Sequence, residues 1–198
     1  DKSEYLVTFY PTSVLVTGFD IIFFWVARMM MSMYMMKKVP FRKCYIHGLV
    51  RDEKGQKMSK SKGNTIDPMI LVEQYGADAL RFFMAAMETQ GRDINMSESR
   101  IAGYRNFATK LWNAARFGEM NECKLQTGFD ETQAKLAVNQ WIIAKAKQAT
   151  KEVTDNLNAF RFSEAANAVY QFVWGSFCDW YIEMIKPILY GEDESAKA

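Results

Sequence analysis

The first third of the chain contains short apolar runs that end at turn residues. Val14–Thr17 is an apolar run typical of a buried strand, and Gly18 ends it. The next segment, Phe19–Met29, has the length and composition of a helix packed on a sheet. After a polar turn, Lys43–Val50 predicts a second strand. A strand, a tight turn and a helix in this order predict the start of a nucleotide-binding α/β unit, whose ligands lie beyond the carboxyl ends of the strands.

The remainder of the chain has apolar positions at helical spacing. Pro68–Gln74 and Ala77–Met87 predict two short helices. A longer helix begins at Ser97–Arg100, and two further helices are predicted, around Leu136–Leu157 and over Ser163–Lys186. Three long helices in succession predict an antiparallel helical bundle.

Each long helix has a predicted inward face. On the first, the face consists of Ile101, Tyr104, Phe107, Ala108, Leu111, Trp112 and Ala115. On the second, it repeats every seven residues at Leu136, Ile143, Thr150 and Leu157, with Asn139, Ala146 and Val153 between them. On the third, it consists of Ala166, Val169, Tyr170, Val173, Phe177, Trp180, Tyr181 and Met184.

Composition favours a folded globular protein. Of the 198 residues, 49% are hydrophobic and 14% aromatic, and the formal net charge of +2 is too small to indicate nucleic-acid binding by itself. Any contact with RNA must therefore come from local patches. Cys44, Cys123 and Cys178 stand far apart and the chain has one histidine, so neither a disulfide framework nor a metal site is predicted. We expect reduced, mostly buried thiols in a cytoplasmic protein.

The apolar run Ile21–Met36 predicts a buried helix and no membrane span. Arg28 interrupts it, and it is shorter than the roughly 20 apolar residues that a bilayer requires. Its methionines are suited to filling irregular gaps in a core. We expect no membrane partner.

One polar segment, Gly55–Asn64, is here called the lysine loop. It holds three lysines, two serines and two glycines. Glycines let the backbone approach a ligand closely, serine hydroxyls offer donors, and lysine ammonium groups are point charges that can follow a moving anion. A solvated surface turn is the alternative, because charge runs usually face water. The order of the residues in Lys57–Ser61, which matches a known family signature, favours a phosphate site over a surface turn.

Lys57–Ser61 matches, residue for residue, the second signature of the class I aminoacyl-tRNA synthetases. Other segments resemble this family in order and at similar spacing, and together they extend over essentially the whole chain: Gly18–Met29, Asp52–Asn64, Tyr75–Phe82 and Tyr104–Arg116. After the glycine-aspartate turn, Ile21 and Trp25 resemble the valine-specific members. The resemblance implies activation of valine by ATP to valyl-adenylate, followed by transfer of the valyl group to tRNA(Val).

The resemblance also implies roles for individual residues. Lys57 and Lys60, assisted by Ser59 and Ser61, would stabilise the triphosphate charge as pyrophosphate departs. The implied ATP-binding set is Gly18, Asp20, His47, Gly48, Met58 and Lys60. Ile21 and Trp25 would line the valine pocket, and Mg²⁺ would arrive with the ATP.

Two of these residues keep a second interpretation from the sequence alone. Asp20 could accept hydrogen bonds from the ribose hydroxyls or simply cap a helix. His47 could line the nucleotide site or serve a structural role. Basic residues near the junction with the helical part are candidates for contact with the tRNA backbone, although such residues mostly face water: Arg92, Arg100, Arg105, Lys110 and Arg116.

The expected fold is an α/β remnant, the second half of a Rossmann-like nucleotide-binding fold, followed by an all-α helical bundle, and the chain is mostly α overall. We expect the catalytic part at 1–66, a connecting helical segment at 67–96 and a truncated anticodon-binding bundle at 97–198. The family's first signature, a His-Ile-Gly-His string, and its editing domain are absent. We therefore expect the C-terminal portion of a longer, monomeric synthetase, inactive by itself, with apolar surface exposed around Ile21–Met36.

Two alternatives remain open at this point. One is a catalytically inert tRNA-binding module derived from a synthetase. The other is a fragment of the related isoleucyl enzyme.

Overall fold

A computed structural model of the chain describes residues 3–124 and 127–191, and these form two units. The first unit contains the described residues up to Ile66 together with Met87–Met96. The second contains Asp67–Ala86 and the described residues from Ser97 onward. The predicted connecting segment is thus distributed over both units. Its role as a functional division of the chain stays a prediction.

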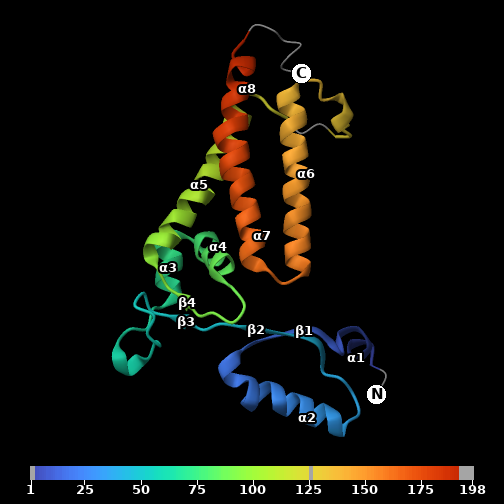
Figure 1. Cartoon of the computed structure of the whole chain (residues 1–198), viewed down its shortest axis with the longest axis vertical. Helices are drawn as coiled ribbons and strands as arrows, with labels where there is room; N and C mark the ends of the chain where they lie inside the picture. The colour runs from blue at the N-terminus through green and yellow to red at the C-terminus, as the bar shows by residue number, and fades with distance from the viewer. Residues whose placement is uncertain (1–2, 125–126, 192–198) are drawn as a thin grey trace. The chain divides into compact units, whose positions relative to one another are not determined.

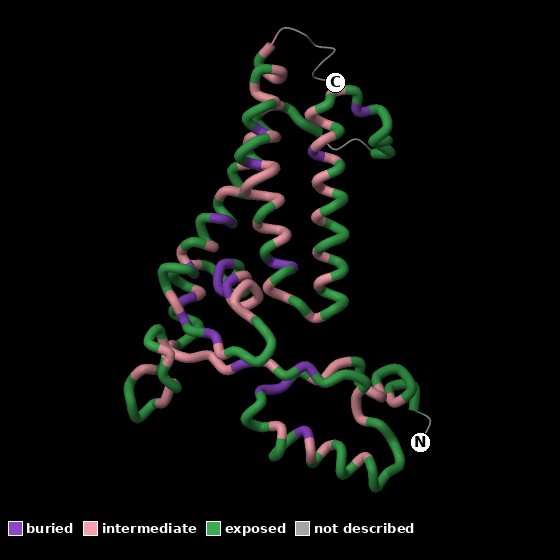
Figure 2. Tube along the Cα trace, viewed as in Figure 1, coloured by how far each residue is buried: buried purple, intermediate pink, exposed green. Residues whose placement is uncertain are grey.

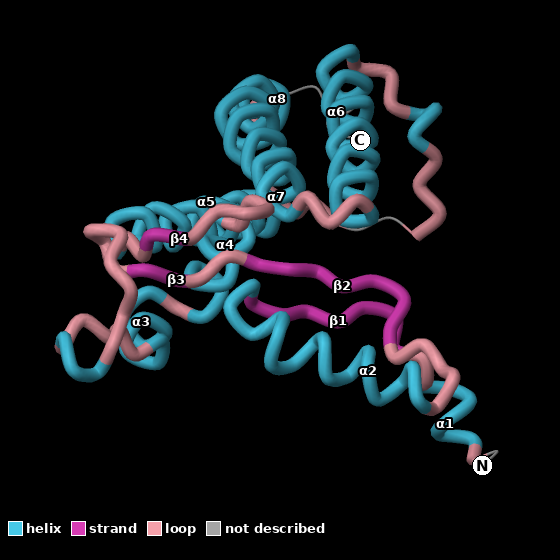
Figure 3. Tube along the Cα trace, turned by 60° about the horizontal axis from the view of Figure 1, so that its bottom comes forward, coloured by secondary structure: helices cyan, strands magenta, loops and turns pink. Residues whose placement is uncertain are grey.

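The first unit is built around two parallel strands. Strand β1 (Thr12–Gly18) pairs with β2 (Phe41–His47), and α2 (Ala27–Met35) lies beside them in the connection (Figure 1, Figure 3). The remaining elements of this unit are α1 (Glu4–Phe9), the 3-10 turn η1 (Phe19–Ile21), the π-helical η2 (Ile22–Val26), β3 (Val50–Arg51), the 3-10 turn η3 (Lys60–Lys62) and β4 (Ile94–Asn95). The predicted order of strand, helix and strand is confirmed. Helix α1 is not among the predicted elements.

The predicted strand Lys43–Val50 is wrong at its end. Strand β2 stops at His47, and β3 forms a separate parallel pair with β4. The break falls at Gly48, where the segment around Arg92 comes so close that a Cβ atom would lie 1.9 Å from the Arg92 carbonyl oxygen. The segment that returns at 87–96 takes over the pairing, because the Ile94 amide donates to the Leu49 carbonyl over 2.8 Å.

The helix after β1 is more exposed than its apolar sequence predicts. Within Ile21–Met36, Val26 is the buried residue, whereas Tyr34 and Met35 are largely exposed (Figure 2). Val16 of the predicted buried strand is exposed as well. Burial is incomplete because the described sheet has only two strands, which leave most of this surface uncovered. The expected exposure of apolar side chains around this segment is confirmed.

The second unit is helical. Its elements are α3 (Pro68–Tyr75), most of α4 (Ala77–Met87), α5 (Glu98–Met120), the 3-10 turn η4 (Glu131–Gln133), α6 (Ala137–Asn158), α7 (Phe162–Tyr170), the π-helical η5 (Gln171–Tyr181) and α8 (Ile182–Leu189). The last three are consecutive and lie beside α6, as Figure 1 shows. Asp67 caps α3 by accepting the Met69 amide over 2.8 Å. The predicted helical bundle is confirmed, and α4 has the predicted ends.

An aromatic cluster joins α4, α5 and α7 in this unit. The Phe107 ring lies 5.1 Å from the ring of Phe82 and 4.9 Å from that of Tyr170, measured between centroids. Phe83, Leu71 and Ile101 are the largest fully buried side chains of the described residues. Aromatic contacts of this kind add to the free energy gained by burial alone.

Each of the three predicted inward faces is partly wrong. On α5, Ile101 and Phe107 are buried, but Leu111 and Trp112 are exposed. On α6, the predicted positions Thr150 and Leu157 are exposed, whereas Asn139, Ile143, Ala146 and Val153 are half-buried. On the last helix, Ala166 is buried as predicted, but Trp180 and Met184 are exposed, and Cys178 and Ile182 are buried instead. The apolar period of a helix predicts that it has an inward face, but the neighbouring helices decide which residues of that face are covered.

Candidate functional site

The carboxyl ends of β1 and β2 bring together three residues of the predicted nucleotide site. Gly18 lies opposite His47 in the parallel ladder. A Cβ atom at Gly18 would lie 2.7 Å from Oδ1 of Asp20 and 3.7 Å from Cε1 of His47. Glycine is therefore what allows the Asp20 carboxylate to fold back over the strand end, and Asp20 remains exposed there. This is the edge at which ligands bind in open α/β sheets.

His47 and Gly48 line a cavity of about 540 Å³ within the first unit. Its other lining residues are Phe19, Cys44, Tyr45, Ile46, Gln90 and Gly91. Nδ1 of His47 lies 2.7 Å from the carbonyl oxygen of Gly48. A carbonyl only accepts hydrogen bonds, so this contact requires a hydrogen on Nδ1, and in the neutral ring it leaves Nε2 as an acceptor.

The lysine loop contains a short 3-10 turn that begins after its central serine. The Ser59 hydroxyl accepts the Lys62 amide over 3.3 Å and lies 3.2 Å from the Ser61 hydroxyl. Gly63 ends the turn in the left-handed region at φ 66°, where glycine pays no steric cost. The fold therefore gives the predicted signature Lys57–Ser61 a defined backbone.

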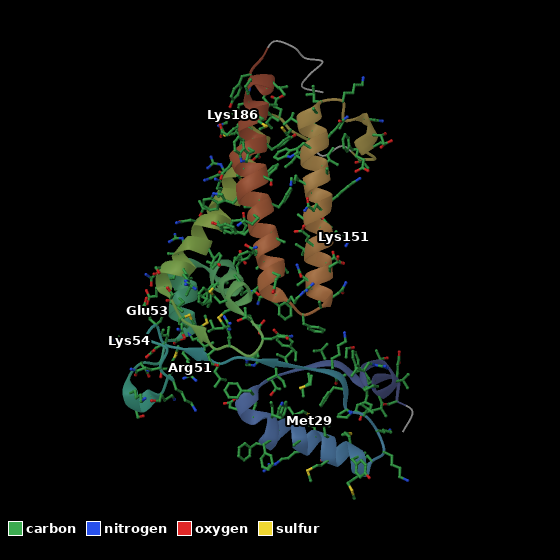
Figure 4. The ribbon with its side chains drawn as sticks, in the orientation of Figure 1. Met29, Arg51, Glu53, Lys54, Lys151 and Lys186 are labelled. Atoms are coloured by element: carbon green, nitrogen blue, oxygen red, sulfur yellow. The ribbon has the colours of Figure 1, made fainter. Side chains whose placement is uncertain are left out.

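The ammonium groups of this loop are available to an anion. Lys57 and Lys60 are exposed, and within the described part of the chain neither forms an ion pair with a carboxylate. Figure 4 shows Glu53 and Lys54 close to Arg51, where the chain enters the loop. Between these two exposed lysines, Met58 is half-buried.

Two residues that sequence reasoning did not assign to the site, Asp52 and Asn64, hold the loop together. The Asn64 amide group donates to Oδ2 of Asp52 over 2.8 Å, and its oxygen accepts the Ser59 amide over 2.9 Å. Oδ1 of Asp52 accepts the Gln56 amide over 2.7 Å. The Asn64 side chain and then the Gln56 amide lower the pKa of Asp52. The sequence signal was only that both residues stand at the ends of the segment that resembles the family.

A second polar anchor fixes the strand that leads into the loop. Asp93 accepts the Leu49 amide over 2.9 Å and forms an ion pair with Arg51. These two contacts, the Leu49 hydrogen bond first, lower the pKa of Asp93. Asp93, which directly precedes β4, thus fixes the backbone after His47 and the strand that leads into the lysine loop.

The predicted valine-pocket residues lie on the helical turns after β1. Ile21 is 42% exposed and Trp25 46% exposed, and neither lines the cavity beside His47. Their places, four residues apart on consecutive helical turns, leave both side chains accessible. Their role stays a prediction.

The predicted tRNA-contact residues are divided between the two units, and those of the second unit do not share one face of their helix. Arg92 belongs to the first unit, and Arg100, Arg105, Lys110 and Arg116 lie on α5 of the second. Helical residues are about 100° apart, so the first three of these point in different directions. Lys110 pairs with Asp179 and lies 4.3 Å from the Trp174 ring centroid, and Arg105 donates to the Gln74 carbonyl over 3.4 Å. Intramolecular contacts therefore already engage Lys110 and Arg105, and the contact of these five residues with RNA stays a prediction.

The described residues hold no group of three or more His, Cys, Asp or Glu side chains arranged to bind a metal ion. In the same part of the chain, no helix is both long and apolar enough to cross a membrane. The thiols of Cys44, Cys123 and Cys178 are free. The predicted burial is wrong for Cys44 and Cys123, which are exposed, and holds for Cys178, where burial raises the pKa of the thiol.

The sequence matches two family models. Residues 1–97 match the class I tRNA synthetases for isoleucine, leucine, methionine and valine, described as "tRNA synthetases class I (I, L, M and V)". Residues 139–198 match the "Anticodon-binding domain of tRNA ligase". The two matches fall on the α/β part and on the end of the helical part.

Curated relatives are similar over the full length of the chain. Valine–tRNA ligase of Brucella suis is 60% identical over 199 residues, which include all of this chain and 22% of the relative. Valine–tRNA ligase of Bradyrhizobium diazoefficiens is 61% identical over 190 residues, or 96% of this chain and 20% of the relative. The chain thus spans about a fifth of the length of these relatives.

Solved structures share the fold. Methionyl-tRNA synthetase of Mycobacterium tuberculosis in complex with methionyl-adenylate matches with a TM-score of 0.80 at 22% identity, over all of this chain and 39% of the other. A leucyl enzyme, the LeuRS of Agrobacterium radiobacter K84, matches with a TM-score of 0.73 at 21% identity, over 84% of this chain and 22% of the other.

Proposed function

Because this chain belongs to the class I tRNA synthetases, we propose that it is the part of a valine–tRNA ligase that handles the phosphates of ATP during valine activation. The observation that carries the proposal is the lysine loop, in which Lys57 and Lys60 are exposed and form no ion pair within the described part of the chain. The 60% identity to valine–tRNA ligases supports valine over isoleucine as the substrate.

In the proposed reaction, a carboxylate oxygen of valine attacks the α-phosphorus of ATP. The bond from the α-phosphorus to the bridging oxygen breaks, and pyrophosphate leaves with the electron pair. Negative charge grows on the leaving group as the bond breaks, so cations fixed at that place stabilise the transition state more than the ground state. Lys57 and Lys60 would supply this charge, with Ser59 and Ser61 as hydrogen-bond donors.

The strand ends would hold the nucleoside part of ATP. Asp20, whose Oδ1 lies where a Cβ atom of residue 18 would stand, would accept hydrogen bonds from the ribose hydroxyls, and Gly18 would let the nucleotide come close. His47 and Gly48 line the neighbouring cavity. Magnesium would enter on the ATP phosphates and neutralise part of their charge. Ile21 and Trp25 offer apolar surface for the isopropyl group of valine.

The second unit would bind tRNA(Val). A groove of about 680 Å³ runs between α6 and the helix formed by α7 and η5. Amide and aromatic side chains line it, among them Gln148, Asn156, Asn167, Gln171, Trp141 and Trp180. Amides can hydrogen-bond base edges and aromatic rings can stack on bases, which is how proteins recognise single-stranded RNA loops. We propose that the enzyme is monomeric and that it acts in the cytoplasm, where tRNA is available.

The proposal can be tested in a full-length enzyme made by replacing the matching 199 residues of the Brucella suis relative with this chain. In the valine-dependent exchange of pyrophosphate into ATP, Lys60→Ala should lower kcat by about 10²–10³-fold, as removing one preorganised charge-stabilising group does. Lys62→Ala is the matched control. Lys62 lies on the same turn with the same charge, and it holds Ser59 through its backbone amide alone.

Equal exchange rates for Lys60→Ala and the unsubstituted enzyme would contradict the assigned role. An inert tRNA-binding module, the remaining alternative, predicts no valine-dependent exchange in the unsubstituted enzyme while tRNA binding persists.

A further inference from the structure

The lysine loop is closed by one side chain at its far end. Asn64 is half-buried and uses both halves of its amide group. Its nitrogen donates to Oδ2 of Asp52 over 2.8 Å and to the Lys57 carbonyl over 3.3 Å, and its oxygen accepts the Ser59 amide over 2.9 Å. Asn64 thus holds the backbone of the signature at its first and third residues, Lys57 and Ser59, and connects both to Asp52.

Asp52 completes this frame from the other side. Its Oδ1 accepts the amides of Lys54 and Gln56 over 3.1 and 2.7 Å. Its own amide donates to the Gln56 carbonyl over 3.0 Å, and its carbonyl accepts the Gly55 amide over 2.9 Å. The carboxylate therefore closes the turn that precedes the signature and offers its second oxygen to Asn64.

The geometry points to Asn64 and Asp52 as positioning residues: we propose that they fix the backbone from which Lys57 and Lys60 reach the triphosphate, without touching the substrate themselves. This inference rests on the proposed function. The chemistry at position 64 is specific, because the site needs a side chain that donates on one side and accepts on the other. An aspartate there would face the Asp52 carboxylate, and an alanine would release the Ser59 amide and the Lys57 carbonyl.

The reason that positioning matters is the sensitivity of charge stabilisation to distance. The lysines lie on an exposed loop that few apolar side chains cover. The hydrogen bonds of Asn64 and Asp52 therefore fix its backbone. A displacement of about 1 Å in a catalytic group can cost on the order of 10²-fold in rate. Losing the frame should therefore lower kcat while leaving valine binding intact.

The first test uses the full-length enzyme described above. Asn64→Ala should lower kcat of valine-dependent pyrophosphate exchange by about 10–100-fold, with the KM for valine and the thermal unfolding midpoint unchanged. Thr65→Ala, at the next position and exposed, is the matched control and should retain the full rate. Full activity of Asn64→Ala would overturn the inference.

A reciprocal exchange tests the pair itself. Asp52→Asn alone and Asn64→Asp alone each break the hydrogen bond between the two side chains. In the double variant, the new amide at position 52 can donate to the new carboxylate at position 64, which still accepts the Ser59 amide. Only the 3.3 Å bond to the Lys57 carbonyl is lost. The double variant should therefore recover most of the lost kcat, and a rate no better than the worse single variant would overturn the inference.

A double-mutant cycle then distinguishes positioning from a general loss of stability. If Asn64 acts through Lys60, adding Asn64→Ala to Lys60→Ala should cost little further rate, because residues that act together are not additive. Fully additive losses would overturn the inference. The proposed function fails separately, when the unsubstituted enzyme lacks valine-dependent exchange.

Discussion

The two units of the chain are stabilised by different interactions. In the first, the functional residues lie on turns that polar side chains hold in place, above all Asp52, Asn64 and Asp93. In the second, aromatic rings around Phe107 pack on one another. Hydrogen bonds specify geometry but add little net free energy each, whereas buried rings contribute several kcal/mol. Substitutions of these polar side chains should therefore change catalysis, and substitutions of the buried rings should change stability.

The largest expected effect on stability comes from the aromatic cluster. Phe107 is 5% exposed, and Phe107→Ala should lower the free energy of unfolding by about 3–5 kcal/mol, through lost burial and the cavity left behind. Urea unfolding of the 198-residue chain, followed by circular dichroism, measures the change. Trp112→Ala on the same helix is the control: Trp112 is 67% exposed and should contribute below about 0.5 kcal/mol. Similar losses for both variants would contradict the described core.

Gly48→Ala tests the point where the two strand pairs separate. The new methyl group would meet the Arg92 carbonyl, a backbone atom that does not move freely, so we expect a loss of about 1–3 kcal/mol in unfolding free energy. The same shift should displace His47 and raise the KM for ATP. Gly103→Ala on α5, where no atom lies within 4 Å, should instead stabilise by about 0.5–1 kcal/mol. If both glycines tolerate alanine equally, the close approach at Gly48 is not as described.

Trp25→Ala should affect recognition of valine more than that of ATP. Loss of this apolar surface should raise the KM for valine about tenfold, or 1.4 kcal/mol, in pyrophosphate exchange. The accessible Phe23, on the same helical turn, provides the control through Phe23→Ala. An equal rise in the KM for ATP, with no preference for valine, would remove Trp25 from the pocket.

The smallest effect concerns Lys110, whose ammonium group contacts both Asp179 and the Trp174 ring. Lys110→Met should cost about 0.5–1 kcal/mol of unfolding free energy, because the pair is partly shielded and the ring adds a cation–π contact. Lys151→Met is the matched control. Its pair with Asp155 is exposed and screened by solvent, so Lys151→Met should change the unfolding free energy less than Lys110→Met does. A loss of tRNA affinity without loss of stability would restore Lys110 as an RNA contact.

In the first unit, the sequence predicted which residues meet at the strand ends better than it predicted where the strands stop. Gly18, Asp20 and His47 were expected at one strand end, and the ladder from Gly18 to His47 brings them there. The frame made by Asp52 and Asn64 was missed, because two polar residues 12 positions apart leave no periodic signal. The end of the second strand was also missed, since it depends on the distant segment around Arg92.

In the second unit, local periodicity predicted the helices but only part of their packing. α4 has the predicted ends because a continuous apolar pattern defines it. The predicted inward faces were wrong at Thr150 and Leu157 of α6, and at Trp180 and Met184 of the last helix. Which face a helix buries depends on its neighbours, and these are not encoded in its own sequence.

The most direct test of the central claim is pyrophosphate exchange by the full-length enzyme that carries this chain in place of the matching Brucella suis residues. The account predicts exchange that depends on valine, exceeds that with isoleucine, and lies within about tenfold of the unmodified relative, a difference of 1.4 kcal/mol in barrier. A folded enzyme that shows no valine-dependent exchange would contradict it.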